Sequence, residues 1–134
     1  MYVLDSNVCI RLLNEQHDGI KAQFISHAPS EIFLCSIVKA ELLFGARHSQ
    51  RVEANLQRLE LFFTPLGSLP FDDKCAEMYA RIRHMLSMDG ALIGPNDMLI
   101  AAIAMANDMI LVTHNQKEFS RIIGLRLEDW ETTT

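Results

Sequence analysis

The chain has 134 residues, of which 49% are hydrophobic and 22% are charged. This length is typical of one domain, and the composition is typical of a globular protein with its own core. Seventeen acidic residues against twelve basic ones give a formal net charge of −5, which excludes a general electrostatic grip on nucleic acid. We therefore expect a single domain over residues 1–134, in which any nucleic-acid contact is local.

The sequence shows no sign of a membrane or secretion signal. Its longest apolar run, from Met98 to Ala106, is far shorter than the ~20 residues that span a bilayer. The first five residues lack the basic start of a signal peptide. Three cysteines without a C-x-x-C pair suit a reducing compartment and argue against zinc. These features predict a cytoplasmic protein that makes no membrane contact.

Short apolar segments alternate with helical patterns along the whole chain. We expect strands over 1–4, 32–35, 66–71, 109–113 and 125–127, the third of them weakened by Gly67 and Pro70. We expect helices over 6–14, 18–27, 37–47, 52–63, 72–90 and 95–106, with a turn or short helix at 116–120. This alternation predicts an α/β fold with a mainly parallel sheet covered on both faces. Ligands of such sheets bind beyond the carboxyl ends of the strands.

Three acidic residues occupy related places in this pattern. Asp5 follows the first expected strand, Glu41 lies in the helix after the second, and Asp97 is in the first turn of the helix before the fourth. Each alone has an ordinary explanation, as a helix cap, an ion-paired surface acid or a charge at a helix N-terminus. Together at one sheet edge they would repel one another unless a cation neutralised them. Such oxygen-rich sites suit Mg²⁺ or Mn²⁺, which indicates metal-assisted hydrolysis of a phosphodiester.

Four segments in this order resemble the PIN domain. They are Val3-Leu4-Asp5-Ser6-Asn7, the stretch 37–45 (IVKAELLFG), the stretch 93–102 (IGPNDMLIAA), and 111–115 (LVTHN) with Glu118-Phe119. The closing stretch 124–130 also fits, and the likeness is closest to VapC-type ribonuclease toxins of type II toxin–antitoxin modules. Each segment alone is weakly specific, whereas the ordered set covers nearly the whole chain. The resemblance implies a three-layer α/β/α domain that acts as a Mg²⁺- or Mn²⁺-dependent endoribonuclease.

The resemblance also implies roles for individual residues. It assigns catalysis and metal binding to the acids Asp5, Glu41 and Asp97, and supporting roles to Ser6, Asn7 and Thr113. Many PIN domains carry a fourth acid two residues after the threonine. Here that residue is Asn115, which is neutral, and the nearest acid downstream is Glu118. Glu118 either takes the place of the missing acid or is an exposed acid on the helix surface.

The partners that the resemblance implies are RNA, a second copy of the chain and an antitoxin. Family members cleave structured RNA such as tRNA or ribosomal RNA, form homodimers and are blocked by a cognate antitoxin. We expect the antitoxin to cross an apolar surface of the first two helices, which carry Val8, Ile10, Leu12, Leu13, Ile20 and Phe24. Arg81 and Arg83 are candidate RNA contacts, although a charged helix face is usually only solvated. His114 is expected to be a solvent-facing loop residue.

Two other functions fit parts of the pattern. A non-catalytic PIN-like module that binds RNA or protein is supported only by the neutral Asn115. A receiver domain with an acidic Mg²⁺ site needs paired acids after the first strand and a lysine after a late strand. The chain has a single Asp5 at the first place, and Lys117 is its only late lysine.

Overall fold

The structure, a computed structural model, describes residues 1–132 and is built around a five-stranded sheet. The strands are β1 (Tyr2–Leu4), β2 (Ile32–Cys35), β3 (Gly67–Leu69), β4 (Ile110–Val112) and β5 (Leu127–Glu128). Their order is β3-β2-β1-β4-β5, and every neighbouring pair is parallel. Val3 in the central strand pairs with Phe33 on one side and Leu111 on the other. The predicted parallel sheet is therefore confirmed.

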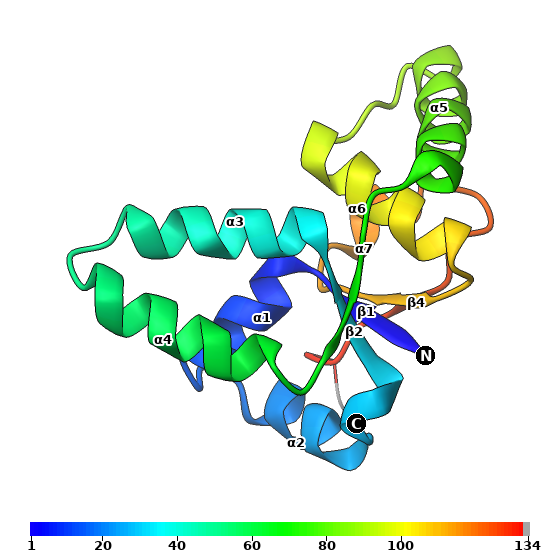
Figure 1. The fold of residues 1–134 in the computed structure, drawn as a ribbon. Helices are drawn as coiled ribbons and strands as arrows, with labels where there is room; N and C mark the ends of the chain where they lie inside the picture. Colours follow the sequence, from blue (N-terminus) through cyan, green and yellow to red (C-terminus); the bar gives the residue numbers. More distant parts are fainter. Residues whose placement is uncertain (133–134) are drawn as a thin grey trace.

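Helices connect the strands and cover the sheet (Figure 1). They are α1 (Ser6–Leu13), α2 (Asp18–Ser26), α3 (Ser36–Arg47), α4 (Val52–Phe63), α5 (Asp73–Met88), α6 (Pro95–Ala106) and α7 (Gln116–Phe119), with a 3₁₀ turn at Pro29–Glu31. Parallel strands are joined almost always by right-handed crossovers. Connections that lead outward from β1 to β2 and β3 therefore lie on one face, and those that return to β4 lie on the other. Figure 1 shows this division, with α3 and α4 together on one side and α5 and α6 on the other.

The order in which strands are added to the sheet reverses between β1 and β4, and the candidate site lies at this reversal point. β1 continues outward to β2 and β3, whereas β4 and β5 lie on its other side. A gap opens above the carboxyl ends of two strands wherever such a reversal occurs, and ligands bind there. Asp5 directly follows β1, and its backbone N–H donates to the carbonyl of Val112 in β4 at 3.1 Å. The first predicted acid thus lies at the reversal point.

Two strands show where the sequence pattern was weak. β3 is an edge strand that forms despite Gly67, and it ends at Leu69, directly before Pro70, so the predicted strand 66–71 was too long. Gly67 is also needed for space, since a Cβ there would lie 2.4 Å from the ring of Phe33. The predicted last strand at 125–127 was placed too early. The N–H of Leu125 still closes a turn onto the carbonyl of Ile122 at 3.4 Å, so β5 begins only at Leu127.

The core includes one helix that is apolar on nearly every side. Six of the twelve residues of α6 are buried, including the whole run from Ile100 to Ala104, and its first turn carries Asp97. Trp130 is also part of the core. Only 2% of its surface is exposed, and its ring lies beside Tyr2 and His27. Among the described residues, no helix is both long and apolar enough to cross a membrane.

Candidate active site

Asp5 is held rigidly where β1 ends. Its side chain is buried, and one carboxylate oxygen accepts a hydrogen bond of 2.9 Å from the backbone N–H of Val8, which caps α1. Burial raises the pKa of Asp5 above its usual range, and hydrogen bonds from Thr113 and Val8 oppose that rise. The charges of Glu41 and Glu131 raise the same pKa further. Asp5 is thus both a helix cap and one member of an acidic group.

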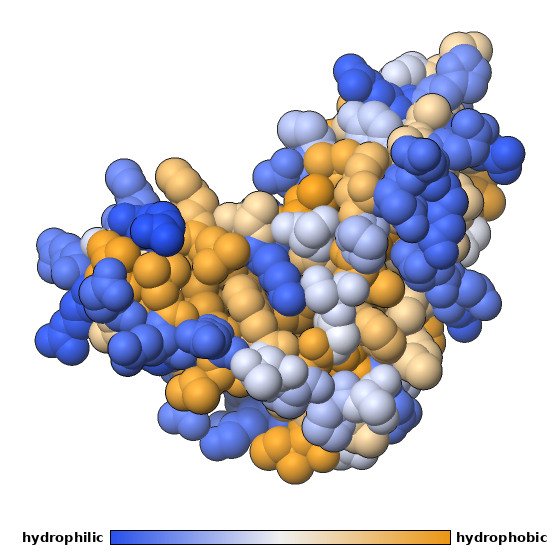
Figure 2. Space-filling model, viewed as in Figure 1, coloured by the Kyte–Doolittle hydropathy of each residue, from blue (hydrophilic) through white to orange (hydrophobic). Residues whose placement is uncertain are grey.

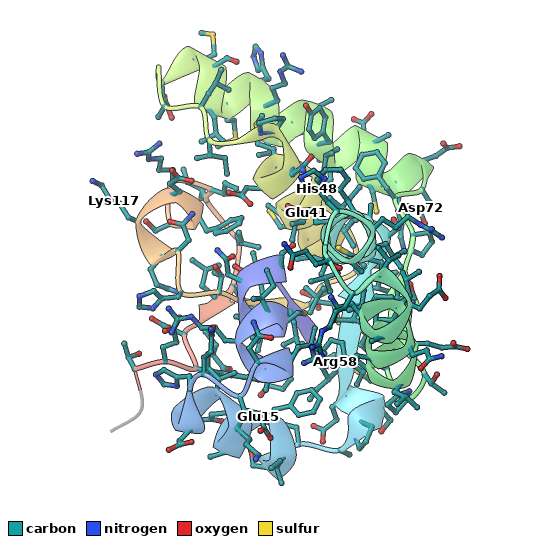
Figure 3. The ribbon with its side chains drawn as sticks, turned by 90° about the vertical axis from the view of Figure 1, so that its left-hand side faces the viewer. Glu15, Glu41, His48, Arg58, Asp72 and Lys117 are labelled. Carbon is teal, nitrogen blue, oxygen red and sulfur yellow. The ribbon has the colours of Figure 1, made fainter. Side chains whose placement is uncertain are left out.

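Glu41 reaches the site from α3, which starts where β2 ends. The hydroxyl of Ser6 donates a hydrogen bond of 2.7 Å to Oε1 of Glu41, linking α1 to α3 across 35 positions of sequence. Figure 3 shows Glu41 on the inner side of the molecule, where α3 approaches α6. The residue next to Asp5 therefore fixes the second acid.

Asp97 completes the predicted group from the N-terminal turn of α6. The pKa of Asp97 rises from an ordinary value of 3.8 to about 6, first because the carboxylate is half-buried and then because of Asp5, Glu118 and Glu41 nearby. The pKa of a carboxylate is raised in this way only by charges that lie within about 10 Å of it. The fold therefore brings together the three acids that the sequence singled out, and adds Glu118.

Glu118 is directed toward this group by its neighbours. The hydroxyl of Thr113, which is fully buried, accepts a hydrogen bond of 3.0 Å from the backbone N–H of Asn115. The side-chain amide of Asn115 donates in turn to Oε2 of Glu118 at 3.1 Å. Lys117, on the same short helix, points outward (Figure 3). Glu118 lies near enough to raise the pKa of Asp97, and its role as the missing fourth acid stays a prediction.

The donor chemistry of these residues suits a divalent cation, although within residues 1–132 no three of their carboxylates bring ligand atoms within 4.8 Å of one another. Within residues 1–132, none of the four carboxylates of Asp5, Glu41, Asp97 and Glu118 forms an ion pair with a Lys, Arg or His side chain. The group therefore carries excess negative charge in a partly buried place, and its donors are all oxygens. Mg²⁺ and Mn²⁺ prefer such a donor set, and either ion would remove the repulsion.

A second polar group lies beside Asp5. In the described part of the chain, only His114, Asp129 and Glu131 bring three ligand atoms within 4.8 Å of one another. Nδ1 of His114 lies 3.0 Å from Asp129 and 3.5 Å from Glu131, and Arg11 pairs with Glu131 at 2.8 Å. Arg11 and the His114 ring face two acids, so this group is a network of polar contacts that joins α1, the loop after β4 and the C-terminal segment. The predicted loop position of His114 is correct, and 58% of its side chain is exposed.

The sequence analysis missed Arg11, Asp129 and Glu131. The two acids follow β5, so the rule that ligands gather beyond strand ends points to them once that strand is placed correctly. Arg11 had no such signal, since it is one of several bases on helices.

Comparisons with known proteins agree with this geometry. The family model described as the PIN domain matches residues 2–125. The chain belongs to the PIN-domain family. A Ribonuclease VapC2 of Rickettsia felis is 39% identical to this PIN domain over 98% of each chain. A tRNA(fMet)-specific endonuclease VapC of Salmonella typhimurium is 36% identical over 96% of this chain and 97% of the relative.

Solved structures lead to the same family. The VapBC2 complex of Rickettsia felis, bound to a DNA fragment from its promoter, contains a chain with a TM-score of 0.90 and 38% identity, with 96% of this chain and 98% of that chain covered. The DNA-bound VapBC of Salmonella typhimurium gives a TM-score of 0.91 and 36% identity, with 96% and 97% covered. The expectation of a PIN-domain ribonuclease of the VapC type is confirmed at the level of the family.

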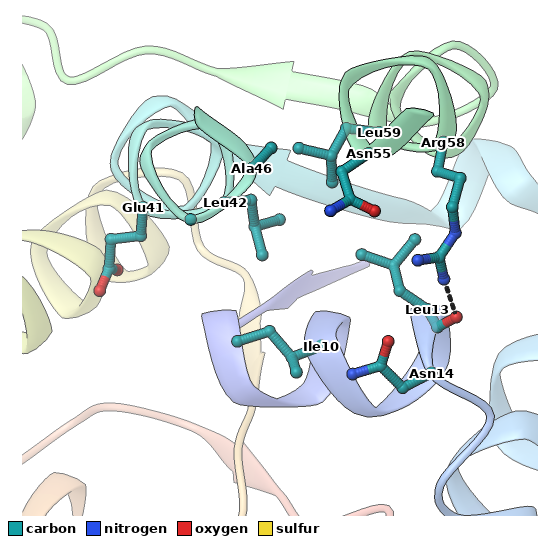
Figure 4. A pocket seen from close by; sticks show the side chains of 10 residues that line it. Ile10, Leu13, Asn14, Glu41, Leu42, Ala46, Asn55, Arg58 and Leu59 are labelled. Atoms are coloured by element: carbon teal, nitrogen blue, oxygen red, sulfur yellow. Dashed lines mark hydrogen bonds between the residues drawn. The ribbon is translucent and has the colours of Figure 1, made fainter. Parts of the chain in front are cut away.

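Two hollows flank the acidic group of this PIN domain, on either side of Ile10. The apolar groove, about 280 Å³ in volume, lies between α1, α3 and α4 and is lined by Ile10, Leu13, Leu42, Ala46 and Leu59, with Glu41 at one end (Figure 4). The polar pocket, about 480 Å³, is lined by Asp5, Asn7, Arg11, Gln16, His114 and Asn115. Figure 2 shows hydrophobic side chains gathered over α3 and α4, the helices that border the apolar groove.

The apolar groove involves only part of the apolar surface that was expected on the first two helices. Of the apolar residues of the first two helices, Val8 and Ile20 are buried in the core, whereas Ile10 of α1 is 41% exposed and Ile25 of α2 is 68% exposed. The remaining wall comes from α3 and α4. The apolar surface thus joins α1 to the α3–α4 pair instead of to α2.

Arg81 and Arg83 lie apart from both hollows. Both are exposed on α5, where Arg81 pairs with Glu77 at 3.5 Å and Arg83 donates to the hydroxyl of Tyr79 at 3.1 Å. Neither lines the apolar groove or the polar pocket. The structure does not bring them to the acids, and their contact with RNA stays a prediction.

Proposed function

We propose that this chain is the toxin of a VapC-type toxin–antitoxin pair, and that it hydrolyses phosphodiester bonds in structured RNA in the cytoplasm with Mg²⁺ or Mn²⁺. The observation that carries the proposal is the group of four carboxylates without a cationic partner at the reversal point of a parallel sheet. Relatives named tRNA(fMet)-specific endonuclease VapC, at 34% and 36% identity, make tRNA the first substrate to test, and ribosomal RNA the second.

Each residue of the site then has a defined task. Asp5, Glu41 and Asp97 would hold the ion, with Glu118 as a fourth oxygen donor. A divalent cation bound there would neutralise the acids and stabilise the negative charge that develops on the phosphate. Ser6 fixes Glu41, and Asn115 fixes Glu118, so that the carboxylates are in place before substrate binds. Thr113 supports Asp5 from the buried side.

The direct test is cleavage of purified tRNA and ribosomal RNA with Mg²⁺, with Mn²⁺ and with excess EDTA. Asp5→Asn keeps the shape of the side chain and removes its charge, so cleavage should fall at least 100-fold while the circular dichroism spectrum stays the same. Glu53→Gln, an exposed acid on α4, is the matched control and should cleave like the wild type. Full activity of Asp5→Asn or in EDTA would contradict the proposal. RNA that is bound but uncut in Mn²⁺ would favour a non-catalytic binding module.

We also propose the apolar groove as the place where the antitoxin binds. Solved relatives of this chain are VapBC complexes, as their descriptions state. The walls of the groove are mainly apolar, with Asn14 and Asn55 among them, and the groove reaches Glu41 at one end (Figure 4). Arg58 closes the other end by donating to the carbonyl of Leu13. An apolar segment that follows the groove therefore arrives at the acids, where a basic side chain would pair with them.

For the homodimer we propose a second apolar surface, formed by α5, the end of α6 and the turn before β5. It contains a hollow of about 240 Å³ lined by Met78, Ile82, Met85, Met105 and Ile122. Ile123 beside it is 75% exposed. Apolar surface of this kind is uncommon on monomers and is typical of an interface. Ile123→Glu should shift sedimentation toward the monomer, whereas an unchanged sedimentation coefficient would exclude this surface.

A further inference from the structure

The polar pocket lies on the other side of Ile10 from the apolar groove. Its wall is mostly polar, and like the groove it includes one of the acids of the site. Its walls come from one face of α1, from the turn that follows α1, and from the loop after β4. Asp5 belongs both to this wall and to the acidic group. A molecule in the pocket therefore lies directly beside whatever is bound at the acids.

Two side-chain amides in the wall have hydrogen-bonding capacity to spare. Within the described residues, the amides of Asn7 and Gln16 make no hydrogen bond to protein, and both residues are exposed. An amide presents a donor and an acceptor side by side, which matches the edge of a nucleobase. Carboxylates and ammonium groups lack this pairing.

The imidazole of His114 supplies a flat surface in the same wall. Asp129 binds Nδ1 at 3.0 Å, so the ring is held at a fixed angle although most of the side chain is exposed. Unstacked bases of single-stranded RNA commonly stack on aromatic or histidine rings. Arg11 lines the same pocket and pairs with Glu131 at 2.8 Å, so the two charges compensate each other.

From these contacts we infer that the polar pocket is a nucleoside subsite, which binds the base next to the scissile phosphate of an RNA strand. The inference rests on the proposed ribonuclease function and adds where the sequence of the RNA is recognised. The volume of about 480 Å³ lies within the roughly 300–1,000 Å³ of small-ligand pockets. Because the paired charges leave the wall nearly neutral beyond Asp5, a neutral base fits it better than a second phosphate does. Asn7 and Gln16 would hydrogen-bond to the edge of the base and so select it, and the ring of His114 would stack on the base.

The test is a titration of the protein with AMP, GMP, CMP and UMP, each at millimolar concentration and without divalent ions, followed by amide chemical shifts. We expect the amides of Asn7, Gln16 and His114 to shift, and one nucleotide to bind several-fold more tightly than the others. Gln16→Ala should lower the affinity for that nucleotide about fivefold, which is the effect of one lost hydrogen bond. Gln57→Ala removes an exposed amide on α4 that lines neither the polar pocket nor the apolar groove. It is the matched control and should bind the nucleotide like the wild type.

A second experiment measures recognition during cleavage. An RNA pool with a randomised window is cut, and the ends are sequenced. Gln16→Ala should relax the preference at the single position next to the cleaved bond, while the other positions keep theirs. If RNA is cut but no nucleotide changes the chemical shifts of these amides, the inferred nucleoside subsite is wrong and the proposed ribonuclease function stands. If no RNA is cut, the titration still tests the pocket. Nucleotide-induced shifts confined to the apolar groove would also overturn the inference.

Discussion

The hydroxyl of Ser6 donates to Oε1 of Glu41 at 2.7 Å, and this bond joins two segments 35 residues apart in sequence. Ser6 directly follows Asp5, which caps α1 with its own carboxylate. One turn of chain after β1 therefore contributes one acid to the site and fixes the position of a second. Glu41 would otherwise be a flexible side chain on a partly exposed helix, and its freedom would have to be lost when an ion binds.

Removal of this bond should affect both catalysis and ion binding. Ser6→Ala leaves Glu41 mobile, and a hydrogen bond to a charged group contributes about 1.5–3 kcal/mol. We expect kcat to fall about tenfold and the Mn²⁺ concentration for half-maximal activity to rise, as measured by initial rates in a metal titration. Ser6→Thr keeps the hydroxyl and should restore most of the activity. A Ser6→Ala protein with wild-type values for both quantities would show that Glu41 needs no support.

The ionised form of Asp97 should destabilise the metal-free protein. In the folded state the pKa of Asp97 is about 6, against an ordinary value of 3.8, mainly through burial and the neighbouring acids. Between about pH 4 and pH 6 the folded state therefore binds more protons here than the unfolded state does. The contribution of Asp97 to stability accordingly falls as pH rises through this window, and above it the whole penalty remains.

Asp97→Asn removes this penalty, so its effect should depend on pH and on metal. In EDTA at pH 7.5 we expect the variant to melt about 3 °C above the wild type, and the difference should disappear near pH 4. With Mn²⁺ the order should reverse, because an ion that binds only the folded protein stabilises it and the variant has lost a ligand. Thermal melts by circular dichroism test both parts. A variant that melts at a lower temperature than the wild type in EDTA at pH 7.5 would show that ionised Asp97 does not destabilise the metal-free protein.

Glu118 should behave as a member of the acidic site. Glu118→Gln keeps the hydrogen-bonding shape but removes the charge that acts on Asp97. Turnover should fall by an order of magnitude or more, and the requirement for Mn²⁺ should rise. Lys117→Gln changes the charge of the adjacent exposed residue and serves as the control in the same RNA cleavage assay. Activity and metal dependence equal to the wild type would instead assign Glu118 to the surface and leave a site of three carboxylates.

The acids of the site were predictable because their places follow from topology. Asp5 comes directly after a strand, and Glu41 and Asp97 lie on helices next to strand ends, so any parallel sheet with this order brings them to one edge. The role of Glu118 was not decided by sequence. Its direction depends on the amide of Asn115, and that contact exists only because the short helix α7 starts where it does.

Other features depended on packing between segments that have no sequence relation. Arg11, His114 and Glu131 come from α1, the loop after β4 and the segment after β5, and only the finished sheet brings them together. The part that α3 and α4 take in the apolar groove was not predicted, for a similar reason. Helical periodicity gives the apolar face of α1, but it does not tell which neighbour covers that face and which part stays open.

Gly45 offers a way to separate antitoxin binding from folding and catalysis. It lies in α3 on the wall of the apolar groove, and a Cβ at this position would meet nothing within 4 Å. Gly45→Ala should therefore raise stability by about 0.5–1 kcal/mol, because alanine is the better helix former. Gly45→Trp should fill much of the 280 Å³ groove from the same position.

We expect Gly45→Trp to fold and to cleave RNA like the wild type but to bind the cognate antitoxin at least 100-fold more weakly. Purified chain and antitoxin, mixed in a calorimeter, give the affinity, and an RNA cleavage assay with added antitoxin shows whether inhibition is lost. Gly45→Ala adds one methyl group and should keep the affinity within about threefold, since distant or small changes at an open surface alter the free energy little. If Gly45→Trp folds, cleaves RNA and is still inhibited at the wild-type antitoxin concentration, the antitoxin does not occupy this groove.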